Sequence, residues 1–118
     1  MHPARARLCV EEEGRVYIVT FNVMRIVDQM VIREIQAEFD VLVGEVGARE
    51  VLIDFDGVEA LSSSAIGVLV SLHERLEALG GRLKLAGVSD DVAHILSLTR
   101  LDRMLSIHDD RDAALAAF

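Results

Sequence analysis

The sequence predicts a single α/β domain built on a mostly parallel central sheet. Strand-like and helix-like stretches follow each other in the order β-β-α-β-α-β-α-β-α. One stretch, residues 51–55, is almost continuously apolar, as is typical of a central strand covered on both faces. With 52% hydrophobic residues in 118, the chain can fill one core. We expect about four helices and one domain over residues 1–118, with residues 1–6 as a loose extension.

The first two strands are expected to form an antiparallel hairpin at one edge of the sheet. Residues 7–12 and 15–21 are rich in strand-forming residues. Between them stands Glu13-Gly14, a turn signal.

An irregular segment, residues 22–27, is expected to connect this hairpin to the first helix. Its apolar residues Met24, Ile26 and Val27 either cover a sheet edge or form a partner-binding surface. Asp28 is the expected N-cap of the helix. The inward residues recur at helical spacing and are Val31, Ile35, Phe39, Leu42 and Val46.

The middle of the chain predicts a strand, a helix and a second strand. Residues 51–55 form the first strand and residues 82–86 the second. Gly80 is the residue expected to end the helix between them. The inward stripe of that helix is Ala65, Leu69, Leu72, Leu76 and Leu79, widened by Ile66 and Val68.

The C-terminal third predicts a short helix, a short strand and a terminal helix. Ser89 is expected to cap the short helix. The strand is expected over residues 104–107 and the terminal helix over residues 109–118. The inward residues of the two helices are Val92, Ile95, Leu96, Ala114, Leu115 and Phe118.

The charge of the chain points to protein partners. The formal net charge is −8 and the pI about 4.8, so a basic face for nucleic acid is not expected. No apolar run is long enough for membrane insertion, and no signal peptide is evident, so we expect a cytoplasmic protein. A lone cysteine, Cys9, excludes an intrachain disulfide and indicates either a strand residue or a reactive thiol. The oligomeric state stays open.

Catalytic and cofactor motifs are missing from the sequence. No glycine-rich phosphate cradle, nucleophile elbow or metal-ligand spacing occurs, and the four histidines are scattered, so we expect neither an enzyme nor a bound cofactor or metal. A phosphoacceptor aspartate, Asp54 or Asp56 at the end of the central strand, is an alternative site. It is disfavoured because no acidic pair suits Mg²⁺ after the first strand and because Lys84 is the only lysine.

Three serines, Ser62, Ser63 and Ser64, stand directly before the strongest helix pattern. A serine at this place commonly caps the helix. The start of a helix also attracts anions, because its N–H groups are unpaired and carry a partial positive charge. The residues alone therefore leave two interpretations open, a plain cap and a regulated phosphate site.

The serine segment resembles the signature of STAS domains, the domains of sulfate transporters and anti-sigma-factor antagonists. The matching run is Asp54-Phe-Asp-Gly-Val-Glu-Ala-Leu-Ser-Ser-Ser-Ala-Ile-Gly-Val-Leu69. Three later segments, 80–89, 98–105 and 109–115, match the family in the same order. The resemblance covers Leu8 to Phe118 and implies the STAS fold.

The resemblance implies a regulatory role through phosphorylation. In the bacterial regulators of this family, a serine kinase that is also an anti-sigma factor phosphorylates the serine that corresponds to Ser63. Ser62 and Ser64 are the alternative acceptors. The unphosphorylated antagonist binds that partner and frees the sigma factor, and a PP2C-type phosphatase resets the system.

The sequence departs from the family pattern at three places. Ser62 replaces the usual acidic residue, Ala65 the usual glycine and Met24 an aspartate of the partner surface. A constitutive scaffold or subunit, without a phosphorylation switch, is therefore the alternative function. The expected partner-binding residues are Asn22, Met24, Asp56, Ser62, Ser63, Ser64 and Ala65.

Overall fold

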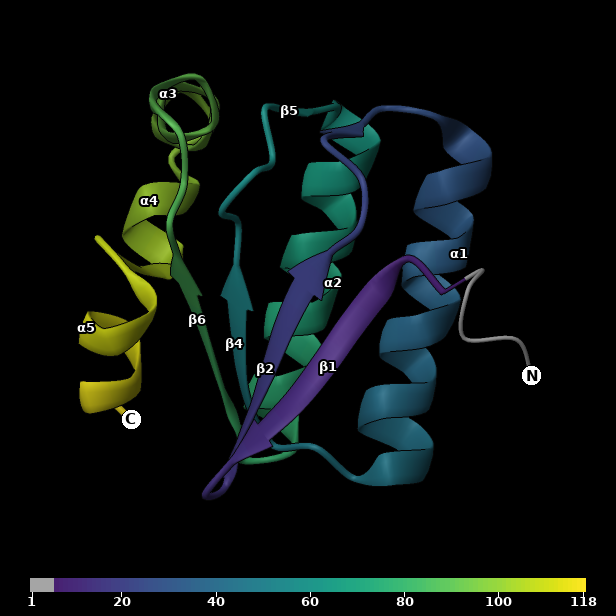
Figure 1. Ribbon diagram of the computed structural model, residues 1–118, viewed down its shortest axis with the longest axis vertical. Coiled ribbons are helices and arrows are strands. Elements are labelled where there is room, and N and C mark those ends of the chain that lie inside the picture. The colour runs from purple at the N-terminus through teal and green to yellow at the C-terminus, as the bar shows by residue number, and fades with distance from the viewer. Residues whose placement is uncertain (1–5) are drawn as a thin grey trace.

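A five-stranded mixed sheet forms the centre of the computed structural model, which describes residues 6–118 (Figure 1). Apart from Ala6, the loose extension expected over residues 1–6 lies outside the described residues. The sheet order is β1-β2-β4-β6-β7. These strands are β1 (Leu8–Glu13), β2 (Val16–Phe21), β4 (Glu50–Asp54), β6 (Arg82–Ala86) and β7 (Ser106–His108).

The strand pairing confirms a mostly parallel sheet with an N-terminal hairpin. β1 and β2 are antiparallel, with Leu8 opposite Phe21 and Glu13 opposite Val16. β2, β4, β6 and β7 are all parallel to one another. β4 thus occupies the centre, as its continuous apolar character predicted.

A second, two-stranded sheet was not predicted. It pairs β3 (Arg25–Ile26) with β5 (Ala60–Leu61) in parallel, so the prediction of a wholly irregular segment over residues 22–27 was wrong. Two residues are too few for a periodic signal, and their pairing depends on a distant part of the chain. Within the segment Ile26 is buried, whereas Met24 and Val27 are exposed.

Two long helices pack against one face of the main sheet. The first, α1 (Gln29–Val41), begins at the Asp28 cap and continues as a π-helical turn, η2 (Leu42–Val46). Val46 was expected to point inward but is exposed, because the wider π-turn rotates Val43 into the core instead.

The second long helix is α2 (Ser63–Ala78). Gly80, the predicted helix-ending residue, follows its C-cap with a φ of 78°. Leu79 was expected to be the last inward residue. It is exposed because it follows the last helical residue and no longer lies on the inward stripe.

The C-terminal third contains one more helix than predicted. α3 (Asp90–Leu98) begins at the Ser89 cap, and the unpredicted α4 (Leu101–Met104) follows it. Met104 therefore belongs to a helix, and the final strand starts later, at Ser106. The terminal helix, α5 (Arg111–Ala116), is capped by Asp110. In the described part of the chain, no helix has the length and apolar character needed to cross a membrane.

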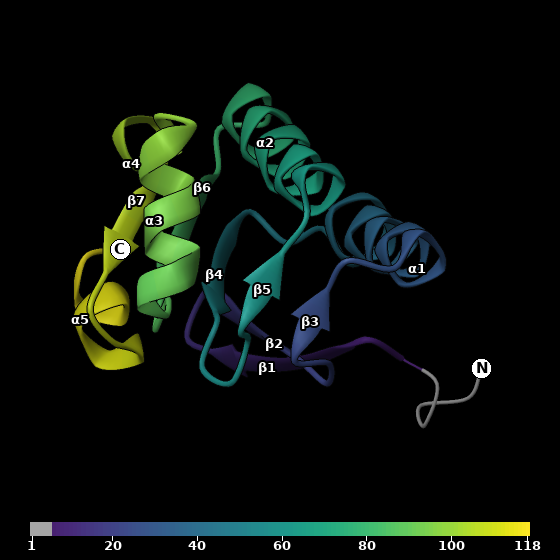
Figure 2. The same cartoon turned by 90° about the horizontal axis from the view of Figure 1, so that it is seen from above.

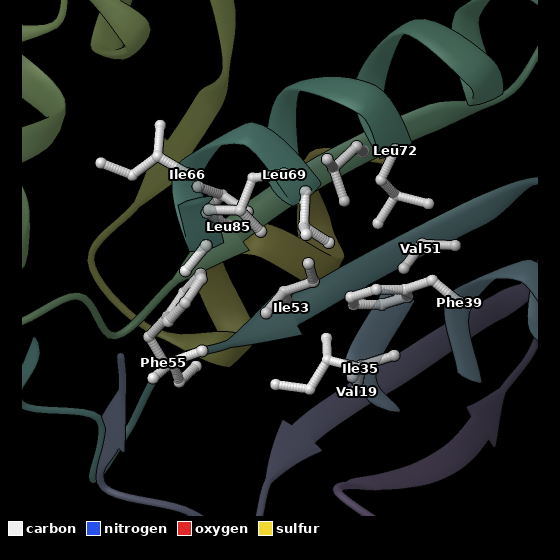
Figure 3. Packing of buried hydrophobic residues seen from close by; sticks show 14 of the residues in the cluster. Val19, Ile35, Phe39, Val51, Ile53, Phe55, Ile66, Leu69, Leu72 and Leu85 are labelled. Atoms are coloured by element: carbon white, nitrogen blue, oxygen red, sulfur yellow. The ribbon is translucent and has the colours of Figure 1, made fainter. Parts of the chain in front are cut away.

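The central strands contribute to two apolar layers. Val19, Ile53 and Leu85 belong to a cluster that includes residues of α1, α2, α3 and α4, and Figure 3 shows the part of it around β4 and α2. Ile18 and Leu52 belong to a smaller cluster with Ala114 of α5. Neighbouring strand residues face opposite ways, and Val51, Leu52 and Ile53 are all buried, so both faces of β4 are covered.

Candidate functional site

The three serines lie at the carboxyl-terminal end of the sheet, where the chain leaves β4 and enters α2 through β5 (Figure 2). The β3 segment runs beside them. Its Met24 carbonyl accepts a hydrogen bond from the Glu59 N–H at 2.6 Å, and the Ile26 carbonyl accepts one from the Ser62 N–H at 3.0 Å. These bonds bring the two predicted parts of the partner surface, separate in sequence, to one edge of the molecule.

The hydroxyl groups of the three serines are in different environments. Ser62 is the N-cap of α2, and its Oγ accepts a hydrogen bond from the Ala65 N–H at 3.2 Å. The Oγ of Ser64 accepts a hydrogen bond from Gln29 Nε2 of α1 at 3.1 Å. Ser63 is exposed, and within residues 6–118 its hydroxyl has no hydrogen-bond partner. Ser63 is thus the one serine of the triplet whose hydroxyl makes no hydrogen bond within residues 6–118.

Two backbone N–H groups beside the Ser63 hydroxyl have no acceptor within α2. The Ala65 N–H is taken by the Ser62 side chain, and the Ile66 N–H donates to the Ser62 carbonyl. The N–H groups of Ser63 and Ser64 precede the first helical hydrogen bond. They carry the partial positive charge of the helix start, which favours an anion at this place.

The remaining predicted partner residues differ in their exposure. Met24 is 61% exposed and Asp56 is also exposed. Asn22 is exposed, but its Nδ2 donates to the Ala6 carbonyl. Ala65 is only 4% exposed and packs in the core, so its side chain is not available to a partner and we leave it out of the surface.

Gln29 and Met30, at the start of α1, extend this edge and were missed from the sequence, whereas Val27 belongs to the apolar segment that the sequence singled out. Val27 and Met30 are 43% and 65% exposed, and Gln29 reaches Ser64. No sequence signal joins them to the serines, because Gln29 and Ser64 are brought together only by the packing of α1 beside α2. With Met24, these residues add exposed apolar side chains to an edge that also carries the exposed Arg25, Asp28 and Glu59.

Asp54, the other polar residue at the end of β4, has a structural role. Its Oδ1 accepts a hydrogen bond from the Asp56 N–H at 3.0 Å, and its Oδ2 accepts one from Arg111 Nε at 3.1 Å. A Cβ on Gly87 would lie 2.8 Å from Oδ1. Asp54 is 7% exposed and both of its carboxylate oxygens accept hydrogen bonds, which argues against its use as a phosphoacceptor. Residues 6–118 contain no cluster of acidic, histidine or cysteine side chains that could hold a metal.

The Asp54 carboxylate has one electrostatic consequence, for Arg111. The hydrogen bond to Asp54 raises the pKa of the Arg111 guanidinium, with a smaller contribution from Glu11 at 3.5 Å. Because the folded pKa is the higher one, the stabilisation is complete below the ordinary arginine pKa and is lost only in strong alkali. The ion pair therefore tethers α5 at every physiological pH.

Comparisons with known proteins agree with this fold. Residues 8–114 match the STAS domain family. A Thermotoga neapolitana protein, described as a homologue of the candidate anti-sigma factor antagonist TM1081, is 32% identical over 69 residues, which is 58% of this chain. The matched region spans 61% of that relative's length.

Two solved structures have the same architecture over nearly the whole chain. The crystal structure of TM1081 from Thermotoga maritima superposes with a TM-score of 0.83 at 21% identity, covering 93% of this chain and 92% of the other. An anti-sigma-factor antagonist (STAS) domain protein from Planctomyces limnophilus gives 0.82 at 28% identity, covering 93% and 95%. The family match, together with this architecture, shows that the chain belongs to the STAS domain family, a regulatory and non-enzymatic family.

Proposed function

We propose that this protein is an anti-sigma-factor antagonist that is switched by phosphorylation of Ser63. The observation that carries the proposal is the free, exposed hydroxyl of Ser63, between a serine that caps α2 and a serine bound by Gln29. The description of relatives as anti-sigma factor antagonists supports the same role. The proposed partner is an anti-sigma factor with serine-kinase activity, in the cytoplasm, and a PP2C-type phosphatase removes the phosphate.

The switch acts through charge at the partner surface. A phosphoserine carries about −1.5 to −2 charges at neutral pH. On Ser63 this charge is accommodated inside the domain by the N–H groups at the start of α2. The phosphate would also face the partner, at the edge that carries the exposed side chains of Met24, Val27 and Met30. Placing a charge in an apolar contact costs free energy in the complex, because the phosphate must lose water there. The unphosphorylated form therefore binds and the phosphorylated form is released.

The test is phosphate transfer to defined variants. The protein is incubated with its cognate kinase and ATP, and intact mass reports the phosphate added. Ser63→Ala is expected to abolish the addition, whereas Ser64→Ala and the exposed Ser71→Ala of α2 retain it. Phosphate added equally to Ser63→Ala, or to none of the proteins, contradicts the proposed acceptor.

A constitutive scaffold is the second candidate function, favoured by one observation. Met24, where the regulators of the family carry an aspartate, is 61% exposed and apolar. A partner surface of this kind does not need a phosphate-dependent contact. Binding of the isolated partner to Ser63→Asp separates the two functions. The switch predicts an affinity lowered at least about tenfold, which is 1.4 kcal/mol, and the scaffold predicts an unchanged affinity.

A further inference from the structure

A second surface lies on the open edge of the sheet, away from the serines. Between β1 and the C-terminal half of α1 the surface forms an apolar groove of about 440 Å³. Its lining includes Leu8, Val10, Tyr17, Val41, Leu42 and Val46. The three valines of this lining, Val10, Val41 and Val46, are 44–52% exposed. We call this surface the β1 groove.

The backbone of β1 offers unpaired hydrogen-bonding groups along the same groove. The Asn22 N–H donates to the Arg7 carbonyl, so the backbone N–H and C=O groups of the odd-numbered residues of β1 point toward β2. Leu8, Val10 and Glu12 must then direct their N–H and C=O groups away from the sheet. β1 is the last strand on this side of the sheet, so no strand within residues 6–118 pairs with these groups.

One outward group of β1 is already satisfied by a side chain of α1. The Leu8 N–H donates to Glu38 Oε1 of α1 at 3.1 Å, so a carboxylate occupies the place where the carbonyl of an added strand would lie. The next outward groups along β1, those of Val10 and Glu12, have no such substitute within residues 6–118. They lie beside the apolar side chains of the β1 groove, so backbone pairing and side-chain burial are available to one ligand.

The charge of β1 decides what kind of strand fits. Cys9, Glu11 and Glu13 are exposed on the face opposite the groove. There Glu11 pairs through one oxygen with Arg111 of α5 at 3.5 Å, and its side chain remains 60% exposed. A second copy of this chain carries the same acidic run, Glu11 to Glu13, and the same net charge of −8, so pairing two β1 edges would bring like charges near one another. A segment with basic residues at alternate positions would instead place positive charges beside the carboxylates of Glu11 and Glu13.

We propose that β1 binds an extended segment of a partner protein as a sixth strand, with apolar residues facing the β1 groove and alternating basic residues facing Glu11 and Glu13. Pairing with the outward groups of Val10 and Glu12 supplies affinity, and the alternation supplies specificity. The surface is separate from the serine edge, so the proposal stands whether or not Ser63 is phosphorylated.

The probe is the peptide acetyl-Lys-Val-Lys-Val-Lys-Val-amide, titrated into the isotope-labelled full chain and followed by amide NMR shifts. We expect shifts concentrated at Val10, Glu12 and Val41, and affinity that falls as salt is added. A peptide with glutamates in place of the lysines, and one with the lysines and valines in separate blocks, are expected to bind at least about tenfold more weakly.

Two variants test the mode of binding. Val10→Pro removes an outward N–H and no bond to β2, so an edge strand tolerates it, and we expect at least about a tenfold loss of affinity. Val41→Glu alters the groove without touching the backbone of β1, and a similar loss is expected. Leu98→Glu, at a residue of α3 that is 70% exposed, is the matched control and leaves binding unchanged.

Three results would overturn the proposal. The first is affinity that neither Val10→Pro nor Val41→Glu lowers. The second is the absence of peptide-induced shifts along β1. The third is a concentration-dependent dimer, seen by sedimentation and abolished by Val10→Pro, which would assign the edge to a second copy of the chain.

Discussion

Asp54 and Ser63 stand at the same end of the sheet, and their surroundings are opposite. Both oxygens of Asp54 accept hydrogen bonds, and the residue is 7% exposed. Ser63 is exposed, and its hydroxyl has no partner in the described part of the chain. The carboxylate is held by a backbone N–H of its own loop and by an arginine of the last helix.

Burial separates polar residues at a strand end that stabilise the fold from those that are accessible to a reacting group. A buried polar group must be satisfied within the protein, because water cannot satisfy it. An exposed hydroxyl has water as its partner and can exchange it for a reacting group. Substitutions at Asp54 are therefore expected to change stability, and substitutions at Ser63 to change phosphate transfer and binding.

The largest effect is expected for Asp54→Ala. It leaves Arg111 and the Asp56 N–H without their acceptor, and we expect a loss of about 2–3 kcal/mol in the free energy of unfolding. Urea denaturation measures it. Glu11→Ala, which removes the exposed partner of Arg111, is the control and costs under about 0.5 kcal/mol. Equal losses in the two variants would show that burial of the carboxylate does not matter.

A smaller effect is expected for Gly87→Ala. The added Cβ would lie 2.8 Å from Asp54 Oδ1, at a φ of 67° that disfavours a side chain. We expect a loss of about 1–2 kcal/mol from the combined contact and backbone strain. Gly14→Ala separates the two causes, since Gly14 has a φ of 62° but nothing within 4 Å of the added atom. If both variants lose the same amount, Gly87 is required by its backbone alone.

The smallest effects compare two neighbouring serines. Ser62→Ala removes the cap of α2 and is expected to cost about 1 kcal/mol. Ser63→Ala removes an exposed hydroxyl without a protein partner and is expected to change stability by less than about 0.5 kcal/mol. Thermal unfolding of the two variants measures both. A larger loss for Ser63→Ala than for Ser62→Ala would reverse the assignment of cap and free hydroxyl.

Local sequence signals predicted most of the fold because they act over a few residues. Asp28, Ser62 and Ser89 all cap the helices for which a cap was expected, although the sequence did not single out one serine of the triplet. The apolar run at 51–55 led to β4 in the centre of the sheet. The misses are short or irregular pieces, namely β3, β5, α4 and the π-turn η2. Their few residues carry no period, and packing decides their form.

The amino-acid sequence by itself determined the order of the long elements, the acidic character and the serine triplet at the start of α2. Only the tertiary structure decided which serine is free, because Gln29 reaches Ser64 from another helix. It also decided that Asp54 pairs with Arg111, and that the edge of β1 lies open beside the β1 groove. Helix caps and hydrophobic periodicity are set by residues close together in the sequence. These three features instead join groups that are distant in the chain and meet only when it is packed.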